Sequence, residues 1–359
     1  MRRSVLVPLA LVAVLAACGG PAAGSPSVQA TPSAPASTAP TTSGTASPSP
    51  SQAGTPLAGR IEAEIAVPGA PDWPLAAFGS IWVLAPDLPI QTGEGTPNLV
   101  RIDPATNEVV ATIALPDRLC QGHVASDDDI WVCAVDALHR IDPATNKIAS
   151  SVPVKGAQTF YQPAFGGGMI WALGSTSLVG DTVIRLDPAT EETTSFPVSA
   201  SVGGMAYGFD ALWLAFPGEG TVVRLDPATG ATEVVASGLV SPKSIVIGSD
   251  SLWVSLHGDP EDQALPGDPQ VARIDPATGD ILAEIEIGGS PQLGVELWAD
   301  DEEVLVRSTT PWLARIDPAT NEVVASFTHE PAVHGPLAVD FGSIWTIAIE
   351  RDVVYRIAP

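Results

Sequence analysis

One phrase recurs along most of the chain and limits the folds that it can adopt. Six copies share Arg, then Ile or Leu, then Asp-Pro-Ala-Thr, and they start at Arg101, Arg140, Arg185, Arg224, Arg273 and Arg315. A seventh, shortened copy closes the chain at Arg356. Subtracting successive numbers gives spacings of 39, 45, 39, 49, 42 and 41 residues. A period near 40 with only short apolar runs is typical of four-stranded propeller blades.

Each repeat unit holds four short apolar runs. In the first unit we expect strands at 74–78, 80–85, 98–103 and 108–115, all rich in residues that favour strands. The chain also has 33 Gly and 35 Pro in 359 residues, which supply turns and leave little room for long helices. The sequence therefore predicts an all-β fold.

The two ends of the chain predict how the ring closes. The last repeat stops at Pro359 without a fourth strand, whereas residues 60–67 form a strand-like run with no blade of their own. We therefore expect an all-β, seven-bladed β-propeller of four-stranded blades, with the N-terminal strand closing the C-terminal blade. Six or eight blades are the alternatives, because a degenerate blade such as the sixth, with Leu305 where others have Trp, can be misread.

The Asp-Pro-Ala-Thr phrase has the chemistry of a turn. Asp opens a type I turn and accepts from backbone N–H groups two residues on, while Pro fixes φ at the next position. The left-handed position that closes the hairpin is then filled by Asn107, Asn146, Gly230, Gly279 and Asn321. Glu191 takes that position in the third repeat, and because Glu disfavours positive φ we expect a longer or irregular hairpin there.

Two other residue types recur once per blade. We expect Trp82, Trp131, Trp171, Trp213, Trp253 and Trp345 to pack between sheets, the alternative being a cofactor box. The repeat arginines lie two residues before an Asp in six blades, so both side chains share a strand face. We expect an ion-pair network between blades, and a ring of ligand-binding arginines is the alternative.

The N-terminal segment predicts export and anchoring. Residues 1–17 contain two arginines, an apolar run and small residues, the layout of a signal peptide. Leu15-Ala16-Ala17-Cys18 resembles the lipobox of bacterial lipoproteins, which implies acylation of Cys18 and a location at the cell membrane, on its outer, extracytoplasmic face. Residues 18–59 carry this cysteine and a disordered Pro/Ser/Thr/Ala linker, and residues 60–359 form the propeller domain.

The net charge limits which molecules the protein can bind, and the cysteines predict a disulfide. With 41 acidic and 16 basic residues the formal net charge is −25, so we expect no nucleic-acid partner. We expect a monomer held at the membrane by its lipid. Cys120 and Cys133 would face each other across a hairpin, which predicts a disulfide in an oxidising compartment; a redox or metal site is the alternative.

Candidate binding residues break the repeat at one face of the ring. Those at the starts of inner strands, which would line the channel mouth as a small-molecule site or as an irregular entrance, are Asp72, Trp73, Gln121, His123, Tyr161, Gln162, Lys243, Glu296 and His334. A long loop in the fifth blade offers oxygen ligands for a divalent cation, calcium or magnesium, or else a solvated acidic surface. The metal candidates there are His257, Asp259, Glu261 and Asp262.

The aromatic second strand followed by an Arg-Ile-Asp-Pro hairpin is similar to bacterial propellers of the YVTN and virginiamycin B lyase-like repeat types. The resemblance covers residues 60–359 and implies a propeller fold. The resemblance leaves two functions open. The first is a ligand- or protein-binding scaffold, whose partner would be a cell-surface protein or a small molecule. The second is a metal-dependent lyase or lactonase that uses His257, His334, Glu296 and Glu330. Binding is favoured because the family's paired His and acidic residues are not visible. A quinone-binding propeller is a third hypothesis, but its tryptophan-docking motif is not seen.

Overall fold

The structure is a computed structural model. It describes residues 55–56, 60–86, 96–116, 119–154, 163–174, 180–257, 270–288, 295–308, 310–329 and 335–359. The lipobox, the signal segment and most of the linker lie outside this set. Every described residue belongs to the compact unit Gln52–Pro359.

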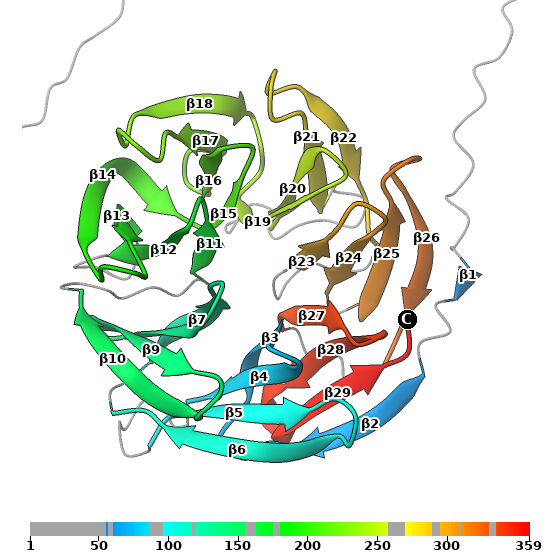
Figure 1. Ribbon diagram of the computed structural model, residues 1–359. Coiled ribbons are helices and arrows are strands. Elements are labelled where there is room, and N and C mark those ends of the chain that lie inside the picture. Colours follow the sequence, from blue (N-terminus) through cyan, green and yellow to red (C-terminus); the bar gives the residue numbers. More distant parts are fainter. Residues whose placement is uncertain are drawn as a thin grey trace, which may run out of the picture. The chain divides into compact units, whose positions relative to one another are not determined.

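Seven sheets surround a common centre (Figure 1), each with its first strand innermost. Blade 1 contains β3 (Asp72–Ala77), β4 (Ser80–Ala85), β5 (Asn98–Asp103) and β6 (Glu108–Ala114). Blade 2 contains β7 (Leu119–Ala125), β8 (Ile130–Ala134), β9 (Ala137–Asp142) and β10 (Lys147–Pro153). Blade 3 contains β11 (Ala164–Gly166), β12 (Met169–Gly174), β13 (Gly180–Leu186) and β14 (Thr193–Val202).

The chain continues around the ring in the same order. Blade 4 contains β15 (Gly204–Gly208), β16 (Ala211–Phe216), β17 (Thr221–Leu225) and β18 (Thr232–Ser237). Blade 5 contains β19 (Pro242–Gly248), β20 (Ser251–Leu256), β21 (Val271–Ile274) and β22 (Ile281–Ile285). Blade 6 contains β23 (Glu296–Ala299), β24 (Val304–Arg307), β25 (Leu313–Asp317) and β26 (Glu322–Phe327). Blade 7 contains β27 (Leu337–Asp340), β28 (Ser343–Ala348) and β29 (Val353–Ile357), with a short 3₁₀ turn at Ile349–Arg351.

The N-terminal strand closes the ring. β2 (Ile61–Ala66) pairs antiparallel with β29 and becomes the outer strand of blade 7. The predicted fold class, blade count and closure are therefore confirmed. One pairing lies further upstream: β1 (Thr55–Pro56), in the segment assigned to the linker, runs parallel to β26 and adds a fifth strand to blade 6. The described residues contain no helix with the length and apolar content needed to cross a bilayer.

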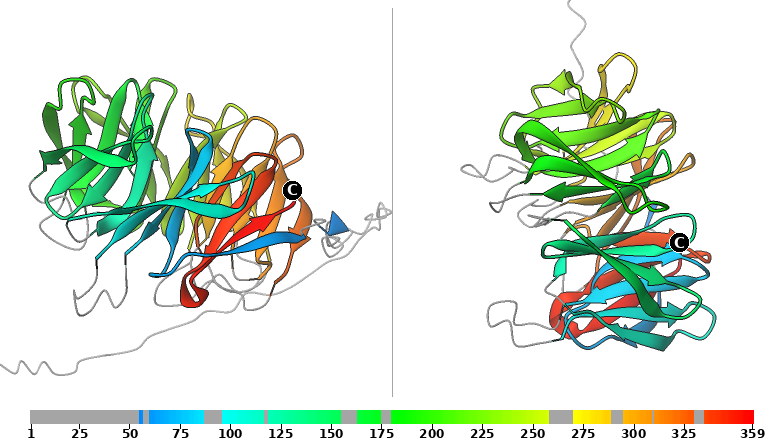
Figure 2. Two further views of the ribbon diagram at one scale, coloured as in Figure 1. Left: turned by 60° about the horizontal axis from the view of Figure 1, so that its bottom comes forward. Right: turned by 60° about the vertical axis from the view of Figure 1, so that its left-hand side comes forward.

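The core lies between blades rather than within one of them. Seven clusters of buried apolar residues each join two neighbouring blades, as Figure 2 shows for the face-to-face packing of the sheets. The six repeated Trp side chains are at most 1% exposed, so the packing prediction is confirmed. Five of them also donate from Nε1 to the carbonyl oxygen five residues earlier, for example Trp82 to Ala77 at 3.0 Å. The second strand of each blade is thus anchored to the turn that precedes it.

The repeated turn forms as the sequence predicts. Asp103 Oδ1 accepts a hydrogen bond from the backbone N–H of Ala105 at 2.8 Å, and the equivalent Asp does so in all six turns. Asn107 closes its turn with φ of 60°. Because these aspartates are used inside their own turns, the expectation that they pair with the repeat arginines is wrong.

Four of the repeat arginines instead join their blade to the turn of the next: Arg101, Arg185, Arg273 and Arg356. Arg101 in β5 donates to the carbonyl oxygen of Pro143 at 2.7 Å and to Asn146 Oδ1 at 3.0 Å, both in the turn of blade 2. Its guanidinium also lies over the Trp82 ring, 4.9 Å from the centroid. Arg356 makes the same contacts with Pro104 and Asn107, across the seam where the ring closes.

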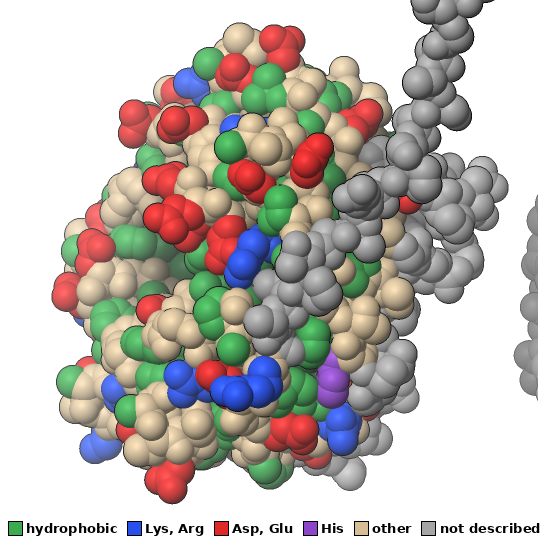
Figure 3. Space-filling view, turned by 90° about the vertical axis from the view of Figure 1, so that its right-hand side faces the viewer, with side chains coloured by type: hydrophobic (Ala, Val, Ile, Leu, Met, Phe, Trp, Pro, Cys, Tyr) green, Lys and Arg blue, Asp and Glu red, His purple; other side chains and the backbone are tan. Residues whose placement is uncertain are grey.

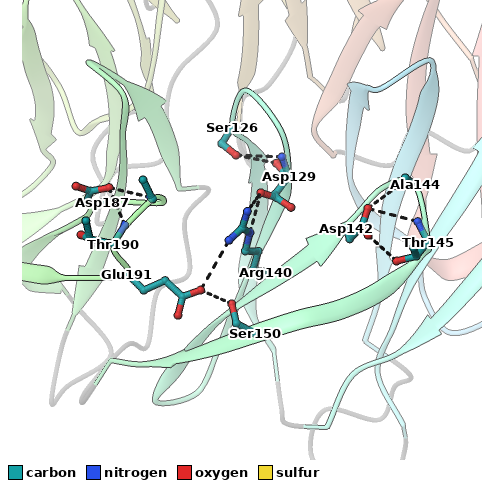
Figure 4. Close-up of polar contacts among 11 residues, drawn as sticks. Ser126, Asp129, Arg140, Asp142, Ala144, Thr145, Ser150, Asp187, Thr190 and Glu191 are labelled. Atoms are coloured by element: carbon teal, nitrogen blue, oxygen red, sulfur yellow. Dashed lines mark hydrogen bonds and ion pairs between the residues drawn. The ribbon is translucent and has the colours of Figure 1, made fainter.

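Blade 2 replaces these hydrogen bonds with ion pairs (Figure 4). Arg140 pairs with Asp129 at 2.6 Å in its own blade and lies 3.9 Å from Glu191 of blade 3. Glu191 also accepts from the Ser150 hydroxyl at 2.5 Å. Glu191 has φ of 59° and bonds back to Asp187 as its counterparts do, so the prediction of an irregular hairpin is wrong. Its carboxylate supplies the acceptor that Asn supplies elsewhere, which compensates for the unfavourable backbone conformation.

Candidate functional site

The inner strands bring several sequence-predicted residues to one end of the channel. All seven run in the same direction, because each blade repeats the same antiparallel order, so their first residues share one face of the ring. Asp72 is the first residue of β3, Glu296 is the first of β23 and Lys243 is the second of β19. These three residues, from blades 1, 6 and 5, are called the channel-mouth triad below.

Electrostatic interactions show that the triad shares one environment. Burial and, to a smaller extent, the charge of Asp72 raise the pKa of Glu296 to about 7, against the opposing effect of Lys243. Burial likewise raises the pKa of Asp72 to about 7, against a hydrogen bond from the backbone N–H of Trp73. Near neutral pH the two carboxyl groups are therefore partly protonated, which is uncommon for surface carboxylates and typical of binding or reactive sites.

The charged groups of the triad interact without touching. Asp72 Oδ1 accepts a hydrogen bond from Trp73 N at 2.9 Å, and this is a contact with the adjacent residue. Within the part of the chain that the structure describes, the side chains of Glu296 and Lys243 make no hydrogen bond or ion pair. The effects of Asp72 and Lys243 on Glu296 are therefore electrostatic and not due to hydrogen bonds.

Bulges at the starts of two inner strands shape this arrangement. The β3–β4 register shifts between Asp72 and Leu75, where Trp73 has φ of 49° ahead of Pro74. The β19–β20 register shifts between Pro242 and Ile245, around Lys243. A bulge adds a residue on one strand and redirects the side chains beside it. The redirected residues include two members of the triad.

Blade 4 approaches the backbone of Lys243 through a glycine. Gly204 is the first residue of β15, and a Cβ atom there would overlap the carbonyl oxygen of Lys243. This close approach requires glycine. The inner strand of blade 4 therefore packs its backbone directly against the backbone of β19 at this point.

His123 lies away from the mouth. Its side chain is fully buried in β7, and burial lowers its pKa to about 3 against a hydrogen bond with the Trp82 backbone. A neutral imidazole packed against blade 1 has a structural role, so this placement argues against the predicted contact with a ligand. The side chain of Gln121 and the whole of Tyr161, Gln162 and His334 lie outside the described residues.

The structure describes only one of the four predicted metal ligands, His257. His257 Nε2 accepts a hydrogen bond from the backbone N–H of Val295 at 3.2 Å, which joins blade 5 to blade 6. Asp259, Glu261 and Asp262 lie outside the described residues. Among the residues that are described, no three His, Cys, Asp or Glu side chains are grouped as a metal site requires. The calcium or magnesium site stays a hypothesis.

The cysteine predictions also remain predictions. β7 and β8 pair antiparallel with Leu119 opposite Ala134, so Cys120 and Cys133 belong to adjacent paired strands. Cys133 is buried, whereas the Cys120 side chain and all of Cys18 lie outside the described set.

The acidic surface is visible in Figure 3, where Asp and Glu side chains are more numerous than Lys and Arg on the face shown.

Comparison with known proteins supports the fold alone. No protein-family model matches the chain, and no curated protein sequence matches it. Among solved structures, the WD40 domain of Pan2 from Neurospora crassa is similar with a TM-score of 0.63 and 12% identity, over 83% of this chain and 94% of that one. The WD40 β-propeller domain of Doa1 also has a TM-score of 0.63, with 9% identity over 84% of this chain and 97% of the other. At identities this low the likeness shows the propeller fold alone.

Proposed function

We propose that this protein is a membrane-anchored, extracytoplasmic lipoprotein whose propeller is a ligand- or protein-binding module, with the channel-mouth triad as its binding site. The observation that carries the binding proposal is the meeting of Asp72, Lys243 and Glu296, from three blades, without direct contacts among them. Concave sites with a few convergent polar groups are the usual places for ligands on rigid folds. The WD40-like propeller architecture is consistent with a scaffold.

The anchor is supported by the sequence around Cys18 and by the Pro/Ser/Thr/Ala linker that follows it. More than one acyl chain makes such an anchor stable. The experiment is expression of the full chain in a bacterium fed a clickable fatty-acid analogue. We expect label on the wild type and on Cys133→Ala, and none on Cys18→Ser. Label retained by Cys18→Ser would exclude this anchor.

The binding site is tested separately by photo-cross-linking on intact cells. A cross-linking residue is placed at Lys243, inside the mouth, and for comparison at Val234, which is 59% exposed on the outer strand β18. We expect a discrete adduct from position 243 that Glu296→Gln weakens, and no such adduct from position 234. Equal adducts at both positions, or an adduct at position 243 whose yield Glu296→Gln leaves unchanged, would contradict a specific site at the mouth.

The alternative, a metal-dependent lyase or lactonase, gains no support from the described residues. His257 is engaged with the backbone of blade 6, Glu296 belongs to no group of three described metal-ligating side chains, and His334 and Glu330 lie outside the described set. It therefore remains the second hypothesis from sequence.

A further inference from the structure

Blades 1 and 6 carry the same hairpin between their third and fourth strands. Residues 101–111 and residues 315–325 both read Arg-Ile-Asp-Pro-Ala-Thr-Asn-Glu-Val-Val-Ala, without a single difference. Both hairpins also have a bulge at the same point, because the register of each shifts between the repeat arginine and the isoleucine that follows it. The fourth strands β6 and β26 therefore present closely similar outer edges.

The outer edge of β26 is paired, whereas that of β6 is open. β1 runs parallel to β26, with Thr55 opposite Ala325 and Pro56 opposite Ser326 (Figure 1). β6 is the last strand of its sheet, and no described strand pairs with its outer edge. An open edge presents backbone N–H and carbonyl groups that can pair with a further strand. Blade 1 thus leaves open the edge that blade 6 uses.

The exposure of the side chains differs between the two edges as this pairing would require. Val109 and Val110 in β6 are 40% and 53% exposed. Their counterparts Val323 and Val324 in β26 are both half-buried, although the sequence around them is identical. Ala325, which pairs with β1, is only 8% exposed, whereas its counterpart in β6 is half-buried. An apolar strip that is covered in blade 6 is therefore exposed in blade 1.

The segment paired with blade 6 indicates what kind of chain this edge accepts. Thr favours strands, and Pro has no backbone N–H, so an added strand with Thr-Pro does not offer a complete new edge to yet another strand. Of the seven residues of β6 only Glu108 is charged, and the chain has a formal net charge of −25, so an acidic segment would be repelled. The matching occupant is extended, uncharged and contains Thr-Pro.

We propose that the outer edge of blade 1 binds an extended, uncharged Thr-Pro segment of a separate partner protein, which adds to β6 as a parallel fifth strand. In this mode of recognition main-chain hydrogen bonds give affinity, and Val109 and Val110 add contacts with side chains. The equivalent edge of blade 5 is less suitable, because Glu284 takes the position of Ser326. This surface lies on the outermost strand of its blade, so the inference goes beyond the proposed function and does not depend on it.

The probe is a fluorescent peptide with the sequence of residues 52–59, Gln-Ala-Gly-Thr-Pro-Leu-Ala-Gly, titrated with the full chain and followed by fluorescence anisotropy. We expect saturable binding that Val110→Lys weakens about tenfold, because lysine on an open edge opposes strand addition. Val110 is exposed, so this variant should keep the melting temperature of the wild type.

Two controls test the specificity of this binding. Leu282→Lys changes the equivalent residue of blade 5, which is 50% exposed, and should leave the affinity for the peptide unchanged. A peptide with Gly-Gly in place of Thr-Pro should bind about tenfold more weakly, because glycine disfavours the extended strand.

Three results would overturn the inference. If the peptide does not bind, the edge of blade 1 does not accept this class of segment. If the peptide binds and Val110→Lys leaves its affinity unchanged, it binds elsewhere, for example on β26 in place of β1. If the wild-type chain alone dimerises in sedimentation velocity and Val110→Lys does not, the edge pairs with a second copy instead. None of these results bears on the channel mouth, which the cross-linking experiment at position 243 tests separately.

Discussion

Replacing Glu296 by Gln removes a carboxylate that folding drives toward its neutral form. Its pKa rises from 4.5 to about 7 in the folded chain, first through burial and second through the charge of Asp72. One pKa unit corresponds to about 1.4 kcal/mol. Ionised Glu296 therefore lowers the free energy of unfolding by about 3 kcal/mol, an upper figure because the side chain keeps part of its exposure to solvent.

The sign follows from the raised pKa. The folded state holds this proton more tightly than the unfolded state, so stability is fully present below the unfolded pKa and is lost as the pH rises through about 7. Gln cannot ionise and avoids that loss. Relative to the wild type, the variant should gain up to about 3 kcal/mol between about pH 5 and about pH 8.

The assay is urea unfolding of the full chain, followed by tryptophan fluorescence at constant salt across that pH range. Glu302→Gln removes an exposed carboxylate and serves as the control, with an effect on stability that should be much smaller than that of Glu296→Gln. The reasoning is refuted if the difference between Glu296→Gln and the wild type is the same at both ends of the range, because burial of an ionising group would then not be its cause.

Two further predictions concern how the ring is held together. Arg101→Met should destabilise the chain more than Asn146→Gly, because Arg101 also donates to Ser80 and Pro143 and because Gly suits the positive φ of residue 146. The hydrogen bond that the two residues share should appear as a coupling of about 1 kcal/mol in a double-mutant cycle in urea, and purely additive effects would contradict the link between blades. Deleting residues 60–67 should lower the melting temperature far more than deleting residues 19–51, because only the former removes the β2–β29 pairing; equal melting temperatures would contradict closure by β2.

Much of the fold was predictable because the repeat encodes it locally. The expected second and third strands of blade 1 match β4 and β5 residue for residue, since Pro and Gly mark their ends. The partners of the arginines were not predictable in this way. Arg101 bonds to a turn 42 to 45 residues further along, so its partner depends on how neighbouring blades pack. The same packing explains why Glu191 tolerates a position that local preferences assign to Asn or Gly.

The candidate site was predictable in location and not in detail. The start of each inner strand follows from the blade pattern, which placed Asp72, Lys243 and Glu296 at one face. That these three of the nine candidates influence one another depends on bulges in β3 and β19, which the sequence does not reveal. A register shift between Leu119 and His123 likewise accompanies the burial of His123, which alternation along the strand does not predict.

The pairing of β1 with β26 and of β2 with β29 also determines how the propeller would respond to mechanical load. Any pull applied to the chain upstream of Thr55 first reaches the two-residue β1–β26 pairing and then the β2–β29 ladder. The β1–β26 pairing is short and would separate at low force, which would lengthen the chain before any blade is disturbed. The second is the seam of the ring, and its rupture would open blade 7 and expose the buried Ile65 and Val67. Under such a pull, the resistance of the propeller is thus set by the β2–β29 pairing rather than by its seven blades together.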